Sequence, residues 1–254
     1  MKTARLFHSF IFAIFSSLII LFTSASLSGY KTVDLSPPII QIKSPGTGSK
    51  VTSPFLLEAN YICSADGLST ISMTDANNDL LFRKILRSDC SSGEVIDLKL
   101  PVYFDTPKEN SLSRISINLN DPFNRPLALS SVDVKLVTNN ELILAAGENK
   151  PAIKITAPQE GAVIQGNSIS VTGAILPASD RAVILEIMTQ PGKIIGTAQV
   201  PILQITEGEY FPFTAQITTK SITEKTNVRL IVRQLGSLIT VDTAIHSVEF
   251  FLEP

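Results

Sequence analysis

The chain has 254 residues, a formal net charge of −2 at pH 7 and no tryptophan. Without a basic excess it lacks the electrostatic footprint that nucleic acids require, so no nucleic-acid partner is expected. Four tyrosines and no tryptophan also disfavour a carbohydrate-binding surface built from exposed aromatic rings.

The first 26 residues are typical of a signal peptide. Lys2 and Arg5 precede an apolar run over residues 10–22, and small residues follow. Thirteen residues are signal-peptide length and short for a membrane-spanning helix. We expect cleavage after Ala25 or Ser26 and a secreted or cell-envelope location. The alternative is an uncleaved N-terminal helix that anchors the protein to a membrane.

One short phrase, Pro-x-Ile-x-Ile-x-x-Pro, occurs twice in the chain. It covers Pro38–Pro45 and Pro151–Pro158, and glycine and valine follow each copy. The phrase describes a proline at a strand edge, a half-buried strand, and then a turn made by proline and glycine. The repeat predicts two copies of one domain, over residues 36–138 and 151–254, and each is long enough for its own core.

Alternation of apolar and polar residues is the local pattern that recurs most often, and it predicts strands with one buried face. The clearest cases are Ile40–Ile42, Ile115–Leu119, Val132–Leu136, Ile169–Val171 and Val228–Val232. Turn-forming clusters separate the strands, at Asp75–Asp79, Asp121–Pro122, Gln190–Lys193 and Gln234–Ser237. Short strands at this spacing predict antiparallel β-sandwiches, one per repeat.

The copies also correspond beyond their opening phrases. The matched segments are Leu57 and Ala59 with Ile169 and Val171, Ile115–Leu119 with Val228–Val232, and Ser131–Val134 with Ser247–Phe250. This correspondence favours duplication of one domain.

The second copy resembles bacterial immunoglobulin-like domains, including those attached to spore-germination and cell-surface proteins. The resemblance rests on Ile155–Pro158, Gly161–Val163 and Ile169–Gly173, and it extends more weakly to the first copy. That copy has Glu58–Asn60 where the pattern places an apolar residue, a small polar residue and glycine. The resemblance implies an all-β fold of two tandem immunoglobulin-like sandwiches, used outside the cell as spacers or for adhesion, and it implies no catalytic residues.

Cys63 and Cys90 are the only cysteines, and both fall in the first copy. An exported chain can hold such a pair as a disulfide. Closing a loop of about 28 residues stabilises a domain by roughly 3 kcal/mol on the chain-entropy model. The alternative is a pair of buried free thiols.

Residues 139–150 form the predicted linker between the copies. Its middle, residues 142–146, is apolar and would be poorly solvated as a free coil. We therefore expect the linker to pack against one domain or between the two, which restricts their relative motion.

The spacing of Asp75, Asn77 and Asp79 is that of the first ligands in a calcium loop. The pattern also needs a glycine at its sixth position and a glutamate at its twelfth, where this chain has Leu80 and Leu86. A polar hairpin turn is therefore favoured over a calcium site.

No set of residues points to catalysis. His246 is the one histidine outside the leader, and no nucleophile elbow accompanies it. The acidic pairs Glu207 with Glu209 and Asp180 with Glu186 could be nominated for glycoside hydrolysis, but without a cleft signature a solvated face is favoured. Zinc-ligand spacings and phosphate-binding glycine loops are missing too. The expectation is a non-enzymatic protein with no metal and no cofactor.

Three apolar runs interrupted by proline stand apart: Ile194–Ile195, Val200–Leu203 and Phe211–Phe213. Burial on two sides explains them most simply. The alternative is a strand edge that accepts a strand from a partner.

Together the leader, the repeat and the missing chemistry predict a non-enzymatic exported binding or spacer module of the bacterial cell envelope or exterior. Its partner would be a protein or an envelope component. The alternative function is an accessory subunit or inhibitor of an exported enzyme, acting through loops at one end of a sandwich.

Overall fold

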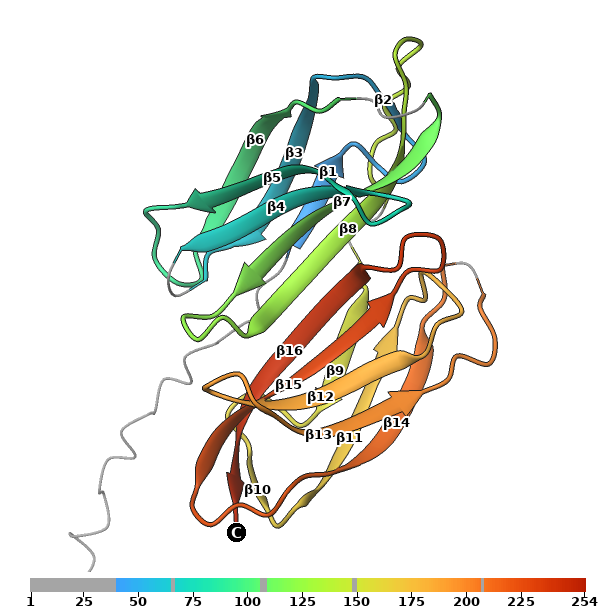
Figure 1. Cartoon of the computed structure of the whole chain (residues 1–254). Helices are drawn as coiled ribbons and strands as arrows, with labels where there is room; N and C mark the ends of the chain where they lie inside the picture. The colour runs from blue at the N-terminus through green and yellow to red at the C-terminus, as the bar shows by residue number, and fades with distance from the viewer. Residues whose placement is uncertain (1–39, 65–66, 106–108, 148–149, 207) are drawn as a thin grey trace, which may run out of the picture. The chain divides into compact units, whose positions relative to one another are not determined.

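The structure, a computed structural model, describes residues 40–254 except 65–66, 106–108, 148–149 and 207 (Figure 1). All of these residues belong to one compact unit, Leu35–Pro254. The expected signal peptide lies outside the described residues. Within the described part every regular element is a strand, and no helix there is long and apolar enough to cross a membrane.

The described residues of the first copy form eight strands. They are β1 (Ile40–Ser44), β2 (Lys50–Val51), β3 (Phe55–Ile62), β4 (Leu68–Asp75), β5 (Leu80–Arg87), β6 (Val95–Val102), β7 (Ser111–Asn120) and β8 (Pro126–Leu136). One sheet has the order β1-β3-β6, and the other has the order β5-β4-β7-β8. The short strand β2 pairs parallel with β8.

The second copy forms eight more strands. They are β9 (Ile153–Ala157), β10 (Val163–Gln165), β11 (Ser168–Ile175), β12 (Val183–Thr189), β13 (Ile194–Val200), β14 (Phe211–Thr218), β15 (Thr226–Leu235) and β16 (Asp242–Glu253). Their sheets have the orders β9-β11-β14 and β13-β12-β15-β16, and β10 pairs parallel with β16.

The two copies therefore share one topology, strand for strand. Both are Greek-key sandwiches of the immunoglobulin-like kind, in which the fifth strand, β5 or β13, joins the sheet of the last two strands. The all-β prediction is confirmed. All five strands and all four turns proposed from the sequence form at the predicted places (Figure 1).

Alternating side chains explain why these segments are strands. Along β3 the burial alternates strictly between buried and partly exposed positions, as it must when one face of a sheet lies on a core. Each sandwich has its own cluster of buried residues, around Leu57, Ile71 and Ile117 in the first copy and around Val171, Leu185 and Leu230 in the second.

The pairing register identifies equivalent residues in the two copies. Ile42 faces Ala59 across β1 and β3, and Ile155 faces Gly173 across β9 and β11. A register irregularity follows at the same point in both pairs, and a cis proline comes next in both, at Pro45 and Pro158. Ala59 is thus the structural equivalent of Gly173.

This register corrects two of the sequence matches. Leu57 and Ala59 correspond to Val171 and Gly173, two residues later than the Ile169 and Val171 matched from sequence. The shift of two keeps every side chain on the same face, so alternation could not detect it. The first copy departs less from the family pattern than the sequence match indicated, because Leu57 and Ala59 now occupy the apolar and the glycine positions.

The same shift of two affects the next-to-last strand. Ile115 faces Val132, and Leu230 faces Val248. Ile115 is therefore equivalent to Leu230 instead of Val228. The match between the last strands of the two copies agrees with the register.

The linker runs along the first sandwich. Leu142 and Lys50 exchange two backbone hydrogen bonds, of 2.8 and 2.9 Å. The amide of Gly46 donates to the carbonyl of Leu144 at 2.7 Å, and the amide of Ala146 donates to the carbonyl of Lys43 at 3.0 Å. Gly46 permits this approach, since a Cβ there would collide with the backbone of the linker.

Candidate functional site

The last strands of the two copies, β8 and β16, pair antiparallel and join the two larger sheets into one (Figure 1). We call this contact, with the residues that cross it, the seam. Leu129 faces Ile245 at its centre, with Ala128 opposite His246 and Ser130 opposite Ala244.

The seam is symmetric about its centre. Val132 and Val248 are equivalent, so Leu129 and Ile245, three residues earlier in each strand, are equivalent too. Equivalent residues that face each other across an antiparallel pair define a local two-fold axis, which is the arrangement of an isologous dimer interface. Here both halves of that interface lie on one chain.

Two serines repeat this symmetry in their hydrogen bonds. The hydroxyl of Ser131 donates to the carbonyl of Thr243 at 2.7 Å, and the hydroxyl of the equivalent Ser247 donates to the carbonyl of Leu127 at 2.9 Å. Each copy therefore uses the same side chain to bind the same backbone position of the other.

A ring of four charged side chains closes one side of the seam. Arg125 donates to Asp121 at 2.6 Å and to Glu249 at 3.0 Å, and Arg229 donates to Glu249 at 2.8 Å. The ring closes where Nε of Arg229 lies 3.6 Å from a carboxylate oxygen of Asp121. The side chains of Asp121, Arg125 and Arg229 are 6%, 1% and 7% exposed. Two members come from the β7–β8 turn of the first copy and two from the sheet of the second.

The other side of the seam uses an arginine at the equivalent position. Arg114 holds Asp133 through two hydrogen bonds of 2.7 and 2.8 Å, as Arg229 holds Glu249 in the second copy. Arg114 also donates from Nη1 to the carbonyls of Ile239 and Val241 in the β15–β16 turn, each at 3.0 Å. The last hairpin turn of each copy therefore covers the equivalent arginine of the other copy.

Burial at the seam changes the pKa of several groups. Desolvation lowers the pKa of Arg229, partly offset by the charge of Glu249. Desolvation also raises the pKa of Glu160, whose carboxylate accepts the amide of Glu249 at 2.9 Å. The arginines stay charged at any physiological pH, so the ring is a permanent feature.

His246 lies beside the centre of the seam and helps to line a cavity of about 320 Å³. Other walls of the cavity come from β1, β8 and β9, with Lys150 and Lys154 among the lining residues. Burial lowers the pKa of His246 to about 4, so the imidazole is neutral near pH 7. No carboxylate lines this cavity among the described residues.

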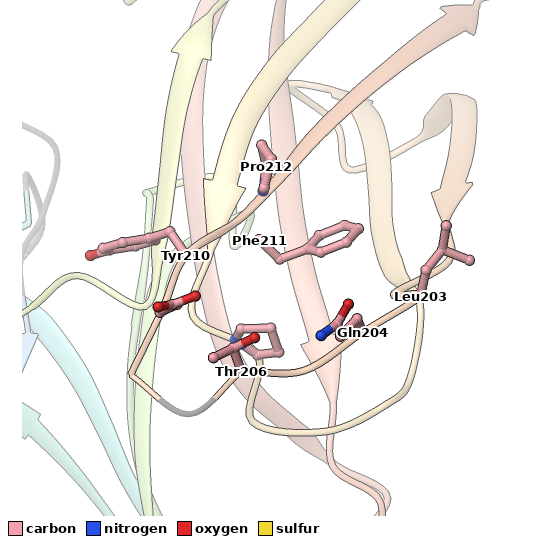
Figure 2. A pocket seen from close by; sticks show the side chains of 8 residues that line it. Leu203, Gln204, Thr206, Tyr210, Phe211 and Pro212 are labelled. Atoms are coloured by element: carbon pink, nitrogen blue, oxygen red, sulfur yellow. The ribbon is translucent and has the colours of Figure 1, made fainter.

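A second pocket, of about 300 Å³, lies where the segment after β13 meets the start of β14. Figure 2 shows the ring of Phe211 pointing toward Leu203 and Gln204, while Tyr210 points away. Tyr210 is held by a 2.7 Å hydrogen bond to the carbonyl of Pro151 and by the ammonium of Lys154, 4.0 Å from its ring centre. Leu203 is 85% exposed. Glu209 is the one carboxylate in the described lining of this pocket.

The three apolar runs are buried only in part. Phe213 is 3% exposed within β14, and Ile195, Val200 and Phe211 pack against the second core. The edge of β13 is also closed in part, because the carbonyl of Ile195 accepts the amide of Lys220 at 3.0 Å. Burial therefore accounts for only part of these runs, because Ile194 and Leu203 are 42% and 85% exposed. Pro201 and Pro212 are exposed as well.

The other candidate metal-binding and catalytic residues proposed from the sequence do not come together in one site. Oδ1 of Asp75 accepts the amides of Asn77 and Asp79 at 2.8 and 2.9 Å, so this carboxylate shapes the β4–β5 hairpin. Glu186 pairs with Arg233 at 3.2 Å, whereas Asp180 is exposed in a loop. Glu207 lies outside the described residues. Over residues 40–254, apart from the four gaps, no group of three potential metal ligands occurs.

Cys63 and Cys90 are bonded as a disulfide. The bridge ties the end of β3 to the segment between β5 and β6. The second copy has no counterpart, although its topology is the same.

Sequence reasoning missed the seam, including Arg114, Arg125 and Arg229. A signal was available: the match of Ser131–Val134 with Ser247–Phe250 already contains the two seam serines and the acids Asp133 and Glu249. An arginine on the neighbouring strand of each copy completes the pattern.

Comparison with known proteins adds similarity at the level of shape. No family model matches the chain, and no curated protein matches it. Latent PorU from Porphyromonas gingivalis is 17% identical over 87% of this chain and 20% of its own, with a TM-score of 0.29. The Ig1-2 module of the Drosophila receptor protein tyrosine phosphatase DLAR is 12% identical over 86% of this chain and 100% of its own, with a TM-score of 0.22. The E. coli adhesin CfaE is 8% identical over 86% and 87%, with a TM-score of 0.24.

These similarities carry no functional conclusion, since every TM-score is below 0.5. The chain also spans only about a fifth of the length of the PorU chain.

Proposed function

We propose that this protein is a non-enzymatic, exported binding or spacer module in which two immunoglobulin-like sandwiches act as one rigid body. The observation that carries the proposal is the symmetric seam. Three paired positions of β8 and β16, two reciprocal serine bonds and the charged ring of Asp121, Arg125, Arg229 and Glu249 all restrain the two copies. Sandwiches joined only by a linker would be free to swivel.

Two further features support an exported location. The signal-like leader predicts export, and the Cys63–Cys90 disulfide is stable in oxidising compartments. The resemblance to bacterial immunoglobulin-like domains favours the cell envelope or the exterior, with a protein or an envelope component as partner. The deciding measurement is the intact mass of the protein from its native producer, with the cell fraction noted. A mass starting after Ala25 or Ser26 supports export, and a full-length mass in the cytoplasm contradicts it.

Rigidity is tested by the distance between spin labels placed on the two copies, at Lys99 and Lys193. Both side chains are exposed, and the two native cysteines are in the disulfide and take no label. We expect a single narrow distance distribution. The matched variant Arg125→Ala should broaden it, because that change opens the charged ring. A distribution that is already broad in the parent protein would contradict a rigid module.

A further inference from the structure

Strand β5 is an open edge of the joined sheet. It lies at one end of the strand order and pairs with β4 alone. No hydrogen bond joins it to β6, the strand of the opposite sheet, among the described residues. One row of its backbone groups is therefore available to an added strand.

A single inward-facing residue explains why this edge is open. Phe82 faces Met73, and Gly196 faces Ile187 at the equivalent point of the second copy. A Cβ at Gly196 would collide with Ile217 and Thr219, so the glycine is what lets β13 approach the end of β14. The larger Phe82 stands at that point in the first copy and packs against the first core, so an equally close approach of β5 to β6 would collide with its side chain.

The open edge carries three cations without partners. Arg83, Lys84 and Arg87 are exposed, and none of them forms a salt bridge among the described residues. No acid occurs on β5, nor on β4 from Leu68 to Thr74 opposite it. This local positive charge contrasts with the net charge of −2 of the whole chain.

Apolar side chains alternate with the cations. Ile85, between Arg83 and Arg87 on the outer face, is 58% exposed. Phe82 and Leu86 pack against the first core from the other face and are only partly buried. An added strand would therefore meet two apolar groups flanking Lys84 on its inner face and two cations flanking isoleucine on its outer face.

We propose that β5 accepts an extended acidic segment of another protein as an added strand, with carboxylates at alternate positions and apolar residues between them. Backbone hydrogen bonds would give affinity, and the pairs with Arg83 and Arg87 would select the acidic sequence. The sequence favoured two-sided burial of the apolar runs near β13 and β14 and offered a strand-accepting edge there only as the alternative. The open edge of this proposal is β5, in the first copy. This inference rests on the proposed binding role.

The test uses the purified chain and a fluorescent peptide of about nine residues, the length of a strand, that alternates glutamate with valine. A lysine–valine peptide of the same length is the control ligand. We expect the acidic peptide to bind, the basic peptide not to bind, and the affinity to fall as salt rises. Hydrogen exchange should slow in residues 80–87 when the acidic peptide is present.

Arg83→Glu/Arg87→Glu should weaken binding of the acidic peptide at least about tenfold, because two favourable pairs become repulsive. Lys193→Glu/Lys220→Glu is the matched control: it changes the net charge equally, on exposed residues beside β13, and should leave binding unchanged. No binding, or equal binding of both peptides, would show that the cations only guard the edge against pairing. That result would overturn this inference and leave the label distances, and hence the rigid module, unaffected.

Discussion

Strands β5 and β13 occupy the same place in two sandwiches of one topology, yet one edge is open and the other is closed in part. In β13 the glycine at position 196 lets the end of β14 approach, and the carbonyl of Ile195 is bonded. In β5 the equivalent residue is Phe82, and three basic side chains follow it. The two copies therefore share one topology but differ in how accessible this edge strand is and in the charge that it carries.

The copies also differ in what stabilises them. The first has the disulfide, close to its open edge, and the second has none. At the seam the first copy contributes charged side chains from its last turn, Asp121 and Arg125, whereas the second contributes the backbone carbonyls of Ile239 and Val241. The backbone pairing of β8 with β16 is therefore symmetric, whereas the side-chain contacts around it differ between the copies. Variants can measure the two contributions separately.

The largest effect is expected from breaking the charged ring. Arg125→Ala removes the buried cation that pairs with both Asp121 and Glu249 and leaves Arg229 alone to balance the two carboxylates. We expect the free energy of unfolding to fall by about 3–5 kcal/mol. The control is Lys43→Ala, which removes an exposed pair with Asp97 and should cost less than about 1 kcal/mol. Denaturant unfolding measures both. Equal losses in the two variants would show that the ring does not stabilise the seam.

Removing the disulfide should affect one copy more than the other. Cys63→Ala/Cys90→Ala is expected to lower the stability of the first sandwich by about 3 kcal/mol, because the unfolded loop regains its freedom. Hydrogen exchange should accelerate in β3 and β4 more than in their equivalents β11 and β12. Reductant should affect the parent protein and not the double variant. Equal acceleration in both copies would mean that the bridge stabilises the whole unit.

Acid should weaken the seam through His246. Its pKa in the folded protein is about 4, below the ordinary value of 6.5, so the unfolded state binds the proton first. The contribution of His246 to the free energy of unfolding is therefore fully present above pH 6.5. It falls by up to about 3 kcal/mol as the pH drops toward 4. Burial raises the pKa of Glu160 and Asp242, which acts in the opposite direction.

Comparison with His246→Gln isolates this contribution, since both proteins retain the two acids. Denaturant unfolding between pH 7 and pH 4 should show a smaller loss in the variant. Parallel pH profiles for the two proteins would refute the role of the histidine.

The smallest effects concern the two seam serines, and they sharpen the comparison of the copies. Ser131→Ala removes one hydrogen bond and should cost about 1 kcal/mol. Ser247→Ala should cost about 2 kcal/mol, because its hydroxyl also accepts a 3.0 Å bond from Arg229. The difference is measurable by denaturant unfolding. Identical losses would mean that the contact with Arg229 contributes nothing beyond the symmetric bond.

Much of the fold was predictable because the signals are local. Alternation in Ile115–Leu119 and Val132–Leu136 depends only on which face of a strand is buried, and Gln190–Lys193 forms a turn through its proline and glycine. Alignment of the copies within a strand was less certain. A shift of two residues leaves the buried face unchanged, and only the pairing of Ala59 and Gly173 with their neighbours fixed it.

The candidate site was much less predictable. Arg114, Arg125 and Arg229 look like ordinary surface residues in sequence, because their partners lie in the other copy, more than 100 residues away. A turn of the other copy covers Arg114 and Arg229, whereas Arg125 lies in such a turn and pairs with Glu249. The open edge at β5 was missed for a related reason. Its cations and apolar residues are visible in the sequence, but whether the edge closes depends on the space that Phe82 occupies between two sheets.

The sequence by itself determined the strands, the turns, the duplicated opening phrase and the pair of cysteines available for a bridge. These follow from local backbone preference and from the alternation of side chains, which act within a few residues. Only the tertiary structure decided that β8 pairs with β16, that four charges close into a ring, and that β5 stays open while β13 is closed in part. Backbone hydrogen bonds between strands are the same for every sequence, so the choice of partner strand depends on the side chains that distant segments bring together.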